Sequence, residues 1–256
     1  MVVMTISNRY IPRRNKNIFT RQVFLRKNVL VILSLILGFL SFSIVIITYY
    51  GQNAGNFVMK IDEDAYEKGI ILSTTEDFYV ETPRLVTDSL NNVEPVTYQW
   101  LKIEEATMAN GNYKDPIDRN TYVAYTFYIR NNGFETLDLN MNFRIEGIEK
   151  NVDDAVRVMI IDNGIPTIYK KSEVYDAEYY NNMNHAFDST YGDYPPTEDF
   201  ASKNMVVSKL YRDFKVNDKR KYTIIVWLEG FDPHCDDEIR GGSIKFSMDF
   251  STVGES

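Results

Sequence analysis

An uninterrupted apolar stretch near the N-terminus constrains this chain more than any other feature. No charged residue occurs between Asn28 and Met59. The 21 residues from Val29 to Tyr49 would form a helix roughly 31 Å long, enough to cross a hydrocarbon core of about 30 Å. A buried helix of a soluble domain is the alternative, but 18 or more consecutive apolar residues are rare in such domains. The sequence therefore predicts one transmembrane helix over residues 28–50.

The charges on either side of this stretch differ in sign. Residues 1–27 carry seven basic side chains and no acidic one, and the remainder carries 21 basic and 36 acidic residues. Under the positive-inside rule this places residues 1–27 in the cytoplasm as a basic tail and residues 51–256 outside as an extracellular domain. A cleaved signal peptide is the alternative, but the apolar core is long and the best cleavage candidate, QNA at 52–54, has Gln where a small residue is expected. We therefore expect a single-pass protein of the cell membrane, held in the lipid bilayer by residues 28–50.

The acidic body limits the partners of the protein. Its excess negative charge repels phosphate backbones, so the sequence predicts no nucleic-acid binding. The chain has a single cysteine, Cys235, which excludes an intramolecular disulfide. Packing must therefore stabilise the domain.

Alternating residues predict a mainly β domain. In residues 135–146, apolar and polar side chains alternate, which is typical of a strand with one buried face. The preceding run, 121–130, is rich in aromatic and β-branched residues, and Asn132-Gly133 between the two suits a tight hairpin turn. Asn163-Gly164 predicts a second hairpin within residues 158–169.

Further short runs complete the predicted architecture. We expect strands at 55–61, 69–73, 83–89, 205–214, 221–229 and 243–250, and a short helix near 99–106. Eight or nine strands joined by hairpin turns predict an antiparallel β-sandwich, jelly-roll-like or Ig-like, in one extracellular domain. Exposed edge strands could pair between copies, so self-association is a further prediction.

A loop rich in Tyr, Asn and Asp interrupts this pattern. Residues 173–200 lack strand periodicity and contain Pro195-Pro196. Long loops on rigid scaffolds often carry function, and tyrosines can stack on sugars or peptides. The predicted ligand-contact residues are Tyr179, Tyr180, Tyr191 and Tyr194. The alternative is a loop without a binding role that packs on the protein surface through its own tyrosines.

Motifs of known catalytic sites are missing. Neither His185 nor His234 belongs to an H-E-x-x-H pair, and G-x-S-x-G, Walker and dinucleotide-binding patterns do not occur. The run LEGFDPHCDDE, residues 228–238, concentrates a histidine, the cysteine and five acidic residues. Its spacing does not fit an EF-hand, since Asp237 stands where Gly is required.

Two interpretations of LEGFDPHCDDE stay open. An irregular calcium site would use carboxylates, and its candidate ligands are Asp232, Asp236, Asp237 and Glu238. The other interpretation is a loop joining two strands with its carboxylates facing water, in which Pro233 turns the chain. We predict the loop, and therefore no metal and no cofactor.

Two stretches resemble a known family. GNFVMKI at 55–61, soon after an apolar segment, and the ending from Tyr222 to Ser251 are similar to membrane-linked proteins of Gram-positive-type bacteria, distantly related to the camelysin and TasA-like β-sandwich family. The run Trp227 to Gly230, followed by Asp232 and Cys235, is the most specific part. The resemblance implies a surface or matrix protein with a jelly-roll-like sandwich. Camelysins are described as metallopeptidases, but this chain lacks their zinc motif, and its long apolar span departs from the family's removable signal peptide.

Together these features predict a membrane-anchored cell-surface protein that is not an enzyme. Its β-sandwich would bind a cell-envelope polymer, a matrix component or another protein. The alternative is a surface hydrolase or metal-dependent peptidase that uses the carboxylates near 232–238.

Overall fold

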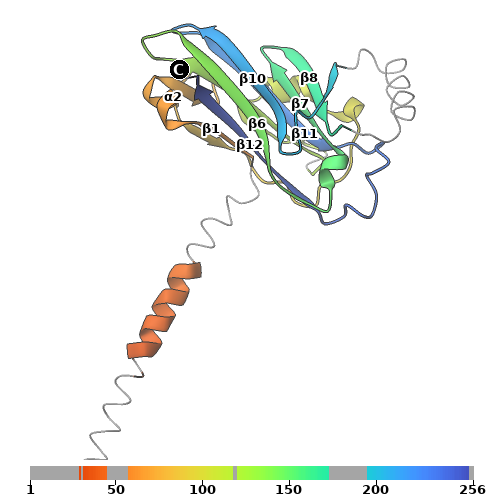
Figure 1. Ribbon diagram of the computed structural model, residues 1–256. Coiled ribbons are helices and arrows are strands. Elements are labelled where there is room, and N and C mark those ends of the chain that lie inside the picture. The colour runs from red at the N-terminus through yellow and green to blue at the C-terminus, as the bar shows by residue number, and fades with distance from the viewer. Residues whose placement is uncertain (1–28, 30, 45–56, 118–119, 173–194, 254–256) are drawn as a thin grey trace, which may run out of the picture. The chain divides into compact units, whose positions relative to one another are not determined.

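The chain forms two compact units, which are described separately. The computed structural model describes residues 29, 31–44, 57–117, 120–172 and 195–253 (Figure 1). The first unit, Met1–Asn53, contains a helix over residues 31–44, and the second, Ala54–Ser256, contains all the strands. Among the described residues, no helix reaches the length and apolar character required for a membrane span. The predicted span, 28–50, extends at both ends into residues outside that description.

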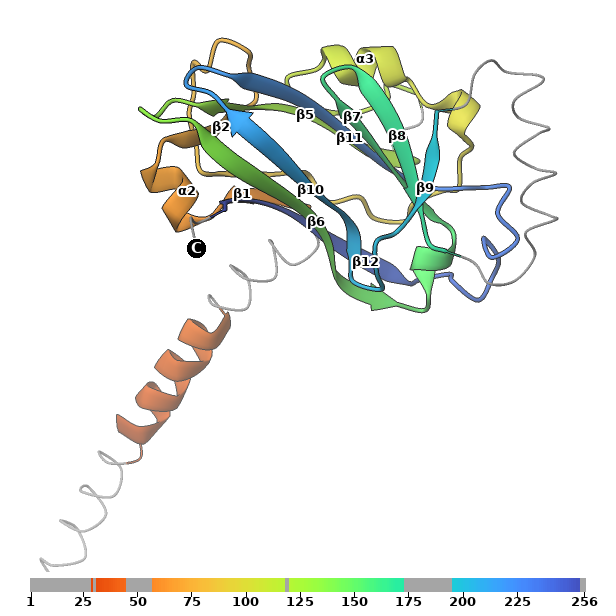
Figure 2. The ribbon, with the colours of Figure 1, turned by 45° about the horizontal axis from the view of Figure 1, so that its top comes forward.

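The second unit is mainly β and is built from two sheets (Figures 1 and 2). The five-stranded sheet has the order β10 (Met205–Phe214), β6 (Leu137–Glu149), β12 (Ser243–Thr252), β1 (Val58–Ile61) and β3 (Arg84–Val86). The seven-stranded sheet has the order β2 (Ile70–Ser73), β5 (Tyr122–Asn131), β11 (Lys219–Leu228), β7 (Val156–Asp162), β8 (Ile165–Lys170) and β9 (Thr197–Asp199), with β4 (Gly111–Tyr113) also paired to β5. The predicted two-sheet, mainly β architecture is therefore present.

The main core lies between the two sheets. Phe250 of the five-stranded sheet meets Phe127 and Tyr222 of the seven-stranded sheet, with ring centroids 6.2 and 5.7 Å away. These three side chains are fully buried. The alternation that predicted β6 has the expected cause, since its apolar side chains Leu139, Met141, Phe143 and Ile145 all point into this core.

The seven-stranded sheet buries part of its second face as well. Ile225 and Trp227 of β11 belong to a separate apolar cluster that includes Ala106 of α3 (Ile103–Met108). Figure 2 shows α3 on the side of this sheet that faces away from the five-stranded sheet. Burial on both faces explains why residues 122–129 of β5 and 222–228 of β11 are mostly apolar instead of alternating with polar residues.

One predicted hairpin is confirmed and the other is wrong. β7 and β8 pair antiparallel, and Asn163 and Gly164 turn between them with φ of 48° and 86°. By contrast β5 and β6, which Asn132-Gly133 connects, lie in different sheets. Gly133 is required there for close packing, since a Cβ at this position would lie 2.0 Å from the carbonyl oxygen of Lys68.

Several element boundaries and pairings also differ from the prediction. The sandwich is not purely antiparallel, because β1 pairs parallel with β12 and β8 pairs parallel with β9. The helix expected near 99–106 is the 3-10 helix η1 (Tyr98–Trp100) followed by α3. The sequence did not predict α2 (Glu63–Glu67), β4, β9 or the 3-10 helix η2 (Val152–Asp154), all of which are only three to five residues long.

Candidate functional site

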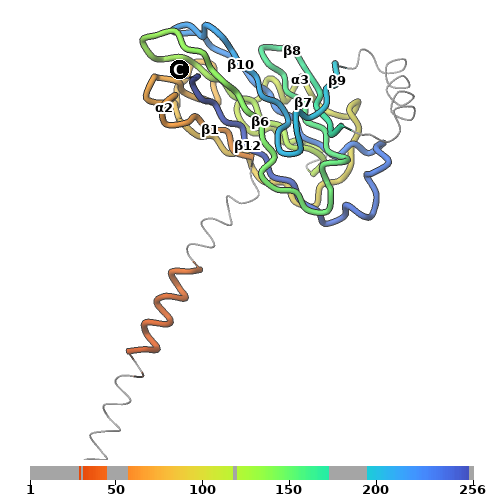
Figure 3. The backbone as a smooth tube through the Cα atoms, viewed as in Figure 1, coloured from red at the N-terminus to blue at the C-terminus, as the bar shows by residue number. Residues whose placement is uncertain are grey.

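The loop that follows β11 carries the predicted metal residues. It runs from Glu229 to Gly242 and leads from β11 in one sheet to β12 in the other (Figure 3). Asp232 is buried, and its Oδ2 accepts a hydrogen bond from Nη2 of Arg157 in β7 at 2.5 Å. Its Oδ1 accepts the backbone N–H of His234 at 2.8 Å. The prediction that this carboxylate faces water is therefore wrong, because an internal ion pair ties the loop to β7.

Two of the other three candidate ligands have partners of their own, and the third, Glu238, is exposed. Asp236 Oδ1 accepts the backbone N–H of Glu238 at 2.8 Å, a bond that turns the loop locally. Asp237 pairs with Arg240 at 3.0 Å, and both side chains are more than four-fifths exposed. Within the residues that the structure describes, no three His, Cys, Asp or Glu side chains are grouped so that they could hold a metal ion. The four carboxylates thus spread apart from one another.

Two buried charges of this region escaped the sequence reasoning. Arg157 is 4% exposed and also donates through Nη1 to the backbone oxygen of Val156 at 3.1 Å. Glu229 is 7% exposed and accepts the indole N–H of Trp227 at 2.9 Å. Burial raises the pKa of Glu229, and the hydrogen bond from Trp227 opposes that rise. A charged residue inside the apolar run VRVMIID was the available signal for Arg157.

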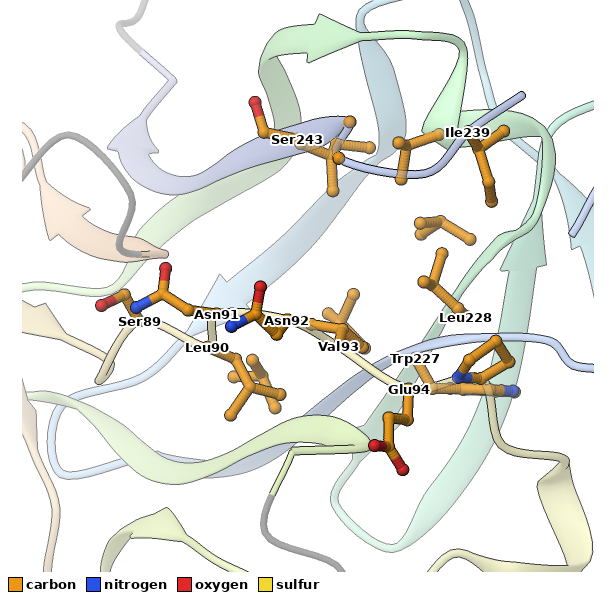
Figure 4. Close-up of a pocket in the computed structure, with 18 of the residues that line it drawn as sticks. Ser89, Leu90, Asn91, Asn92, Val93, Glu94, Trp227, Leu228, Ile239 and Ser243 are labelled. Atoms are coloured by element: carbon orange, nitrogen blue, oxygen red, sulfur yellow. The ribbon is translucent and has the colours of Figure 1, made fainter. Parts of the chain in front are cut away.

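A large cleft with both apolar and polar lining residues opens beside this loop at one end of the sandwich, and we call it the end cleft. Its volume is about 1030 Å³, at the upper limit of the roughly 300–1,000 Å³ typical of ligand sites. Figure 4 shows the segment Ser89 to Glu94 crossing this space, with Ile239 and Ser243 on the opposite side. The apolar side chains that line the cleft from the two sheets and the loop include Val123, Val226, Leu228, Ile239, Ile244 and Phe246.

The end cleft lies where the described strands of the five-stranded sheet end. β12 begins at Ser243, but its described pairing with β1 begins only at Ser247. Beyond β3, the irregular segment Thr87–Pro95 lines the cleft instead of a strand. Consequently Val226 and Leu228, which point toward the core like Tyr222 and Ile224, remain partly exposed.

Cys235, the single thiol of the chain, lines the end cleft. The residue is half-buried, and burial raises the pKa of its thiol. The negative charges of nearby carboxylates raise the pKa of Cys235 further, and Asp232 has the largest effect of these. A thiol with a raised pKa is mostly protonated near neutral pH, which makes it a poor nucleophile.

A second, smaller cavity of about 240 Å³ lies between the two sheets and is lined by residues of β6, β7, β8, β10 and β11. Asp162 of β7 accepts hydrogen bonds from Lys209 Nζ at 2.9 Å and from the Tyr211 hydroxyl at 2.8 Å, both on β10. Its other oxygen pairs with Arg220 of β11 at 2.9 Å. Burial acts to raise the pKa of Asp162, but these hydrogen bonds and the Arg220 charge outweigh it and lower the pKa. We call this group the inter-sheet clamp.

The edge strands bear on the prediction of self-association. In the part of the chain that the structure describes, the only strand that pairs with β10 is β6, and an isolated bridge joins Met205 to Ser202. Its pairing shifts register near both ends, and it carries Lys209 and Arg212. Charged residues and irregular pairing are devices that protect edge strands from unwanted pairing. Self-association stays a prediction that these features do not favour.

The predicted tyrosine contacts fall outside the described residues, since Tyr179, Tyr180, Tyr191 and Tyr194 all lie in 173–194. The described remainder of that loop, 195–200, contains β9 and the buried Phe200. The structure thus provides one large cleft with apolar walls, beside a loop whose buried charges are paired. Comparison of the chain with family models, with curated proteins and with solved structures finds no match.

Proposed function

We propose that this chain is a single-pass protein of the cell membrane whose extracellular β-sandwich binds a partner without catalysing a reaction. The end cleft would be the binding site. The observation that carries the proposal is the set of inward-facing aliphatic side chains, including Val226 and Leu228, that a closed sandwich would bury and this one leaves partly exposed. The jelly-roll-like or Ig-like class and the resemblance to camelysin and TasA-like proteins stay predictions on which the proposal does not depend.

The N-terminal unit supports membrane anchoring. The helix over 31–44 presents exposed apolar side chains on all sides, from Val31 to Ile44. A helix that is apolar all round requires an apolar surrounding, either a protein core or a membrane. The hydroxyls of Ser34, Ser41 and Ser43 donate back to helix carbonyl oxygens, so these polar groups are satisfied within the helix. The basic residues before it favour a cytoplasmic N-terminus.

The loop geometry supports binding rather than hydrolysis. A hydrolase built on residues 232–238 would require at least two carboxylates directed at one reacting group. Asp232 is engaged by Arg157, Asp236 binds the loop backbone, and Asp237 pairs with Arg240 at the surface. These three side chains therefore have structural partners of their own and no common target.

Two measurements on the full chain test the proposal. Protease added outside intact cells should digest the domain after residue 57 but spare the basic tail, and the undigested chain should stay with membranes at alkaline pH. The purified chain in detergent should enhance the fluorescence of an apolar dye beyond the detergent background, and Leu228→Arg should remove that gain while Leu210→Arg on β10 should keep it. Release of the chain into the soluble fraction would refute the anchor, and equal dye binding by both variants would refute the site.

A further inference from the structure

The walls of the end cleft indicate what kind of ligand it accepts. Aliphatic side chains from β5, β11 and β12 form one part of its lining, and polar side chains that include Asn91, Asn92 and Ser243 form another. Ligand sites combine apolar walls with a few polar groups in this way, and a lipid carries the same two parts, an apolar acyl chain and a polar headgroup. We propose that the end cleft binds one acyl chain of a lipid from the membrane that anchors the protein, an inference that rests on the proposed anchoring.

The length of the linker makes such a ligand accessible. Only six residues separate the predicted span, which ends at Tyr50, from Phe57. Seven Cα–Cα steps of about 3.6 Å cover at most about 25 Å. Phe57 itself lines the end cleft, so the length of the chain keeps this one lining residue within that distance of the end of the predicted span. An acyl chain is the apolar ligand that is most concentrated at that position.

The charges around the end cleft select the headgroup. Four carboxylates and two cationic side chains line it: Asp88, Glu94, Asp236, Asp237, Arg240 and Lys245. Asp88 pairs with Lys114, and Asp237 pairs with Arg240. The other charged side chains of the lining are Glu94, Asp236 and Lys245, so negative charge is in excess. An anionic headgroup would be repelled at this rim. The lipid is therefore expected to be neutral or zwitterionic.

Photolabelling in vesicles tests this inference on the full chain. The chain is reconstituted in phosphatidylcholine vesicles that contain a small fraction of phosphatidylcholine with a diazirine at the end of one acyl chain. After irradiation, labelled peptides are identified by mass spectrometry. The expected labels lie in two regions, the apolar segment 29–49 and the cleft-lining segments 87–95 and 226–246. The segment 29–49 serves as the internal standard.

Matched variants separate the cleft from nonspecific contact. Val226→Trp and Ile244→Trp should fill the end cleft, and each displaced methylene should lower binding about fourfold, so cleft labelling should fall about tenfold or more. Leu210→Trp, an exposed aliphatic position on β10 that lines neither cavity, should leave it unchanged. Unfolding in urea verifies that each variant is folded, and the ratio of cleft label to label in 29–49 on the unaltered chain provides a readout that needs no variant.

The outcomes distinguish the two proposals. Label in 29–49 without label in 87–95 or 226–246 would overturn the acyl-chain ligand, leave the anchor intact and favour a polypeptide ligand. Absence of label from 29–49 would overturn the anchor as well. Cleft labelling that is equal in Val226→Trp, Ile244→Trp and the unaltered chain would also overturn the inference. A phosphatidylglycerol probe should label the cleft more weakly relative to 29–49, and equal ratios would overturn the headgroup preference.

Discussion

The ion pair between Arg157 and Asp232 is almost fully removed from water, with side chains 5% and 0% exposed. Removing one partner leaves the other as an unpaired buried charge, which typically costs about 3–5 kcal/mol. We expect Asp232→Ala to lower the free energy of unfolding by about that amount. Replacement of both residues by Leu should cost clearly less than the sum of Asp232→Leu and Arg157→Leu. Urea unfolding of the unaltered chain, these two single variants and the double variant measures this coupling.

The same loop offers the control for this prediction. Asp237 also pairs with an arginine, but both side chains of that pair are more than four-fifths exposed. Asp237→Ala should therefore change the free energy of unfolding by no more than about 0.5 kcal/mol. A similar loss for Asp232→Ala and Asp237→Ala would show that burial of the Arg157 pair does not matter for stability.

Asp162 of the inter-sheet clamp should make stability depend on pH. Burial alone would raise its pKa, but Lys209, Tyr211 and Arg220 lower it below the value of about 3.9 expected in the unfolded chain. A carboxylate with a lowered pKa stabilises the fold above its unfolded pKa, and this contribution is lost as the pH falls through the folded pKa.

Asp162→Asn should therefore cost about 1–3 kcal/mol at pH 7. The difference from the unaltered chain should be constant above about pH 5 and shrink below about pH 4. Urea unfolding at several pH values measures it, with the exposed Glu238→Gln as the control. A difference that grows on acidification would contradict the assigned hydrogen bonds.

At the scale of elements, the β7–β8 hairpin depends on its turn. Gly164 has φ of 86°, and a Cβ added to it would meet nothing within 4 Å. Gly164→Ala should therefore reveal the backbone cost alone, about 1 kcal/mol. Gly147 in β6 has equal free space and no positive φ. Gly147→Ala should be neutral or stabilising by up to about 1 kcal/mol, and equal effects of the two changes on thermal unfolding would refute the turn requirement.

Local sequence patterns predicted which segments form strands and turns, but they did not predict which strands pair with each other. The alternation in β6 and the Asn163-Gly164 turn are properties of adjacent residues, so the sequence shows them directly. The alternation also marks which face of β6 is buried, but it does not identify the neighbouring strand, and this is why β5 and β6 were wrongly paired. Elements of three residues such as β4 carry too few residues for any periodicity.

The candidate site depended on contacts distant in sequence. Asp232 looked like a solvated carboxylate because its partner, Arg157, lies 75 residues earlier. The end cleft could not be predicted at all, because its lining comes from segments that are far apart in the sequence, among them 87–95, 226–228 and 239–246. In the sequence Val226 has the pattern of an ordinary core residue of β11, and only the structure shows that it lines the cleft.

At the scale of the whole molecule, the core between the sheets is closed next to the end cleft and open at the cleft itself. Val158 of β7 is 0% exposed, whereas Val226, its partner in the pairing of β7 with β11, lines the end cleft although both point between the sheets. Truncation to Ala removes the same atoms from each. Val158→Ala should cost about 2–3 kcal/mol, because it adds a cavity to the lost burial, and Val226→Ala about 1 kcal/mol or less.

Urea unfolding in the absence of lipid measures the costs of the two variants. The same measurement is then repeated in the presence of lipid. If an acyl chain fills the end cleft, its binding stabilises the folded chain in proportion to occupancy. Val226→Ala should reduce that added stability while Val158→Ala should keep it, because only Val226 contacts the ligand. Equal costs for the two variants without lipid would contradict an open end. A larger cost for Val226→Ala than for Val158→Ala would show that Val226 is closely packed, and the binding site proposed beside it would fail.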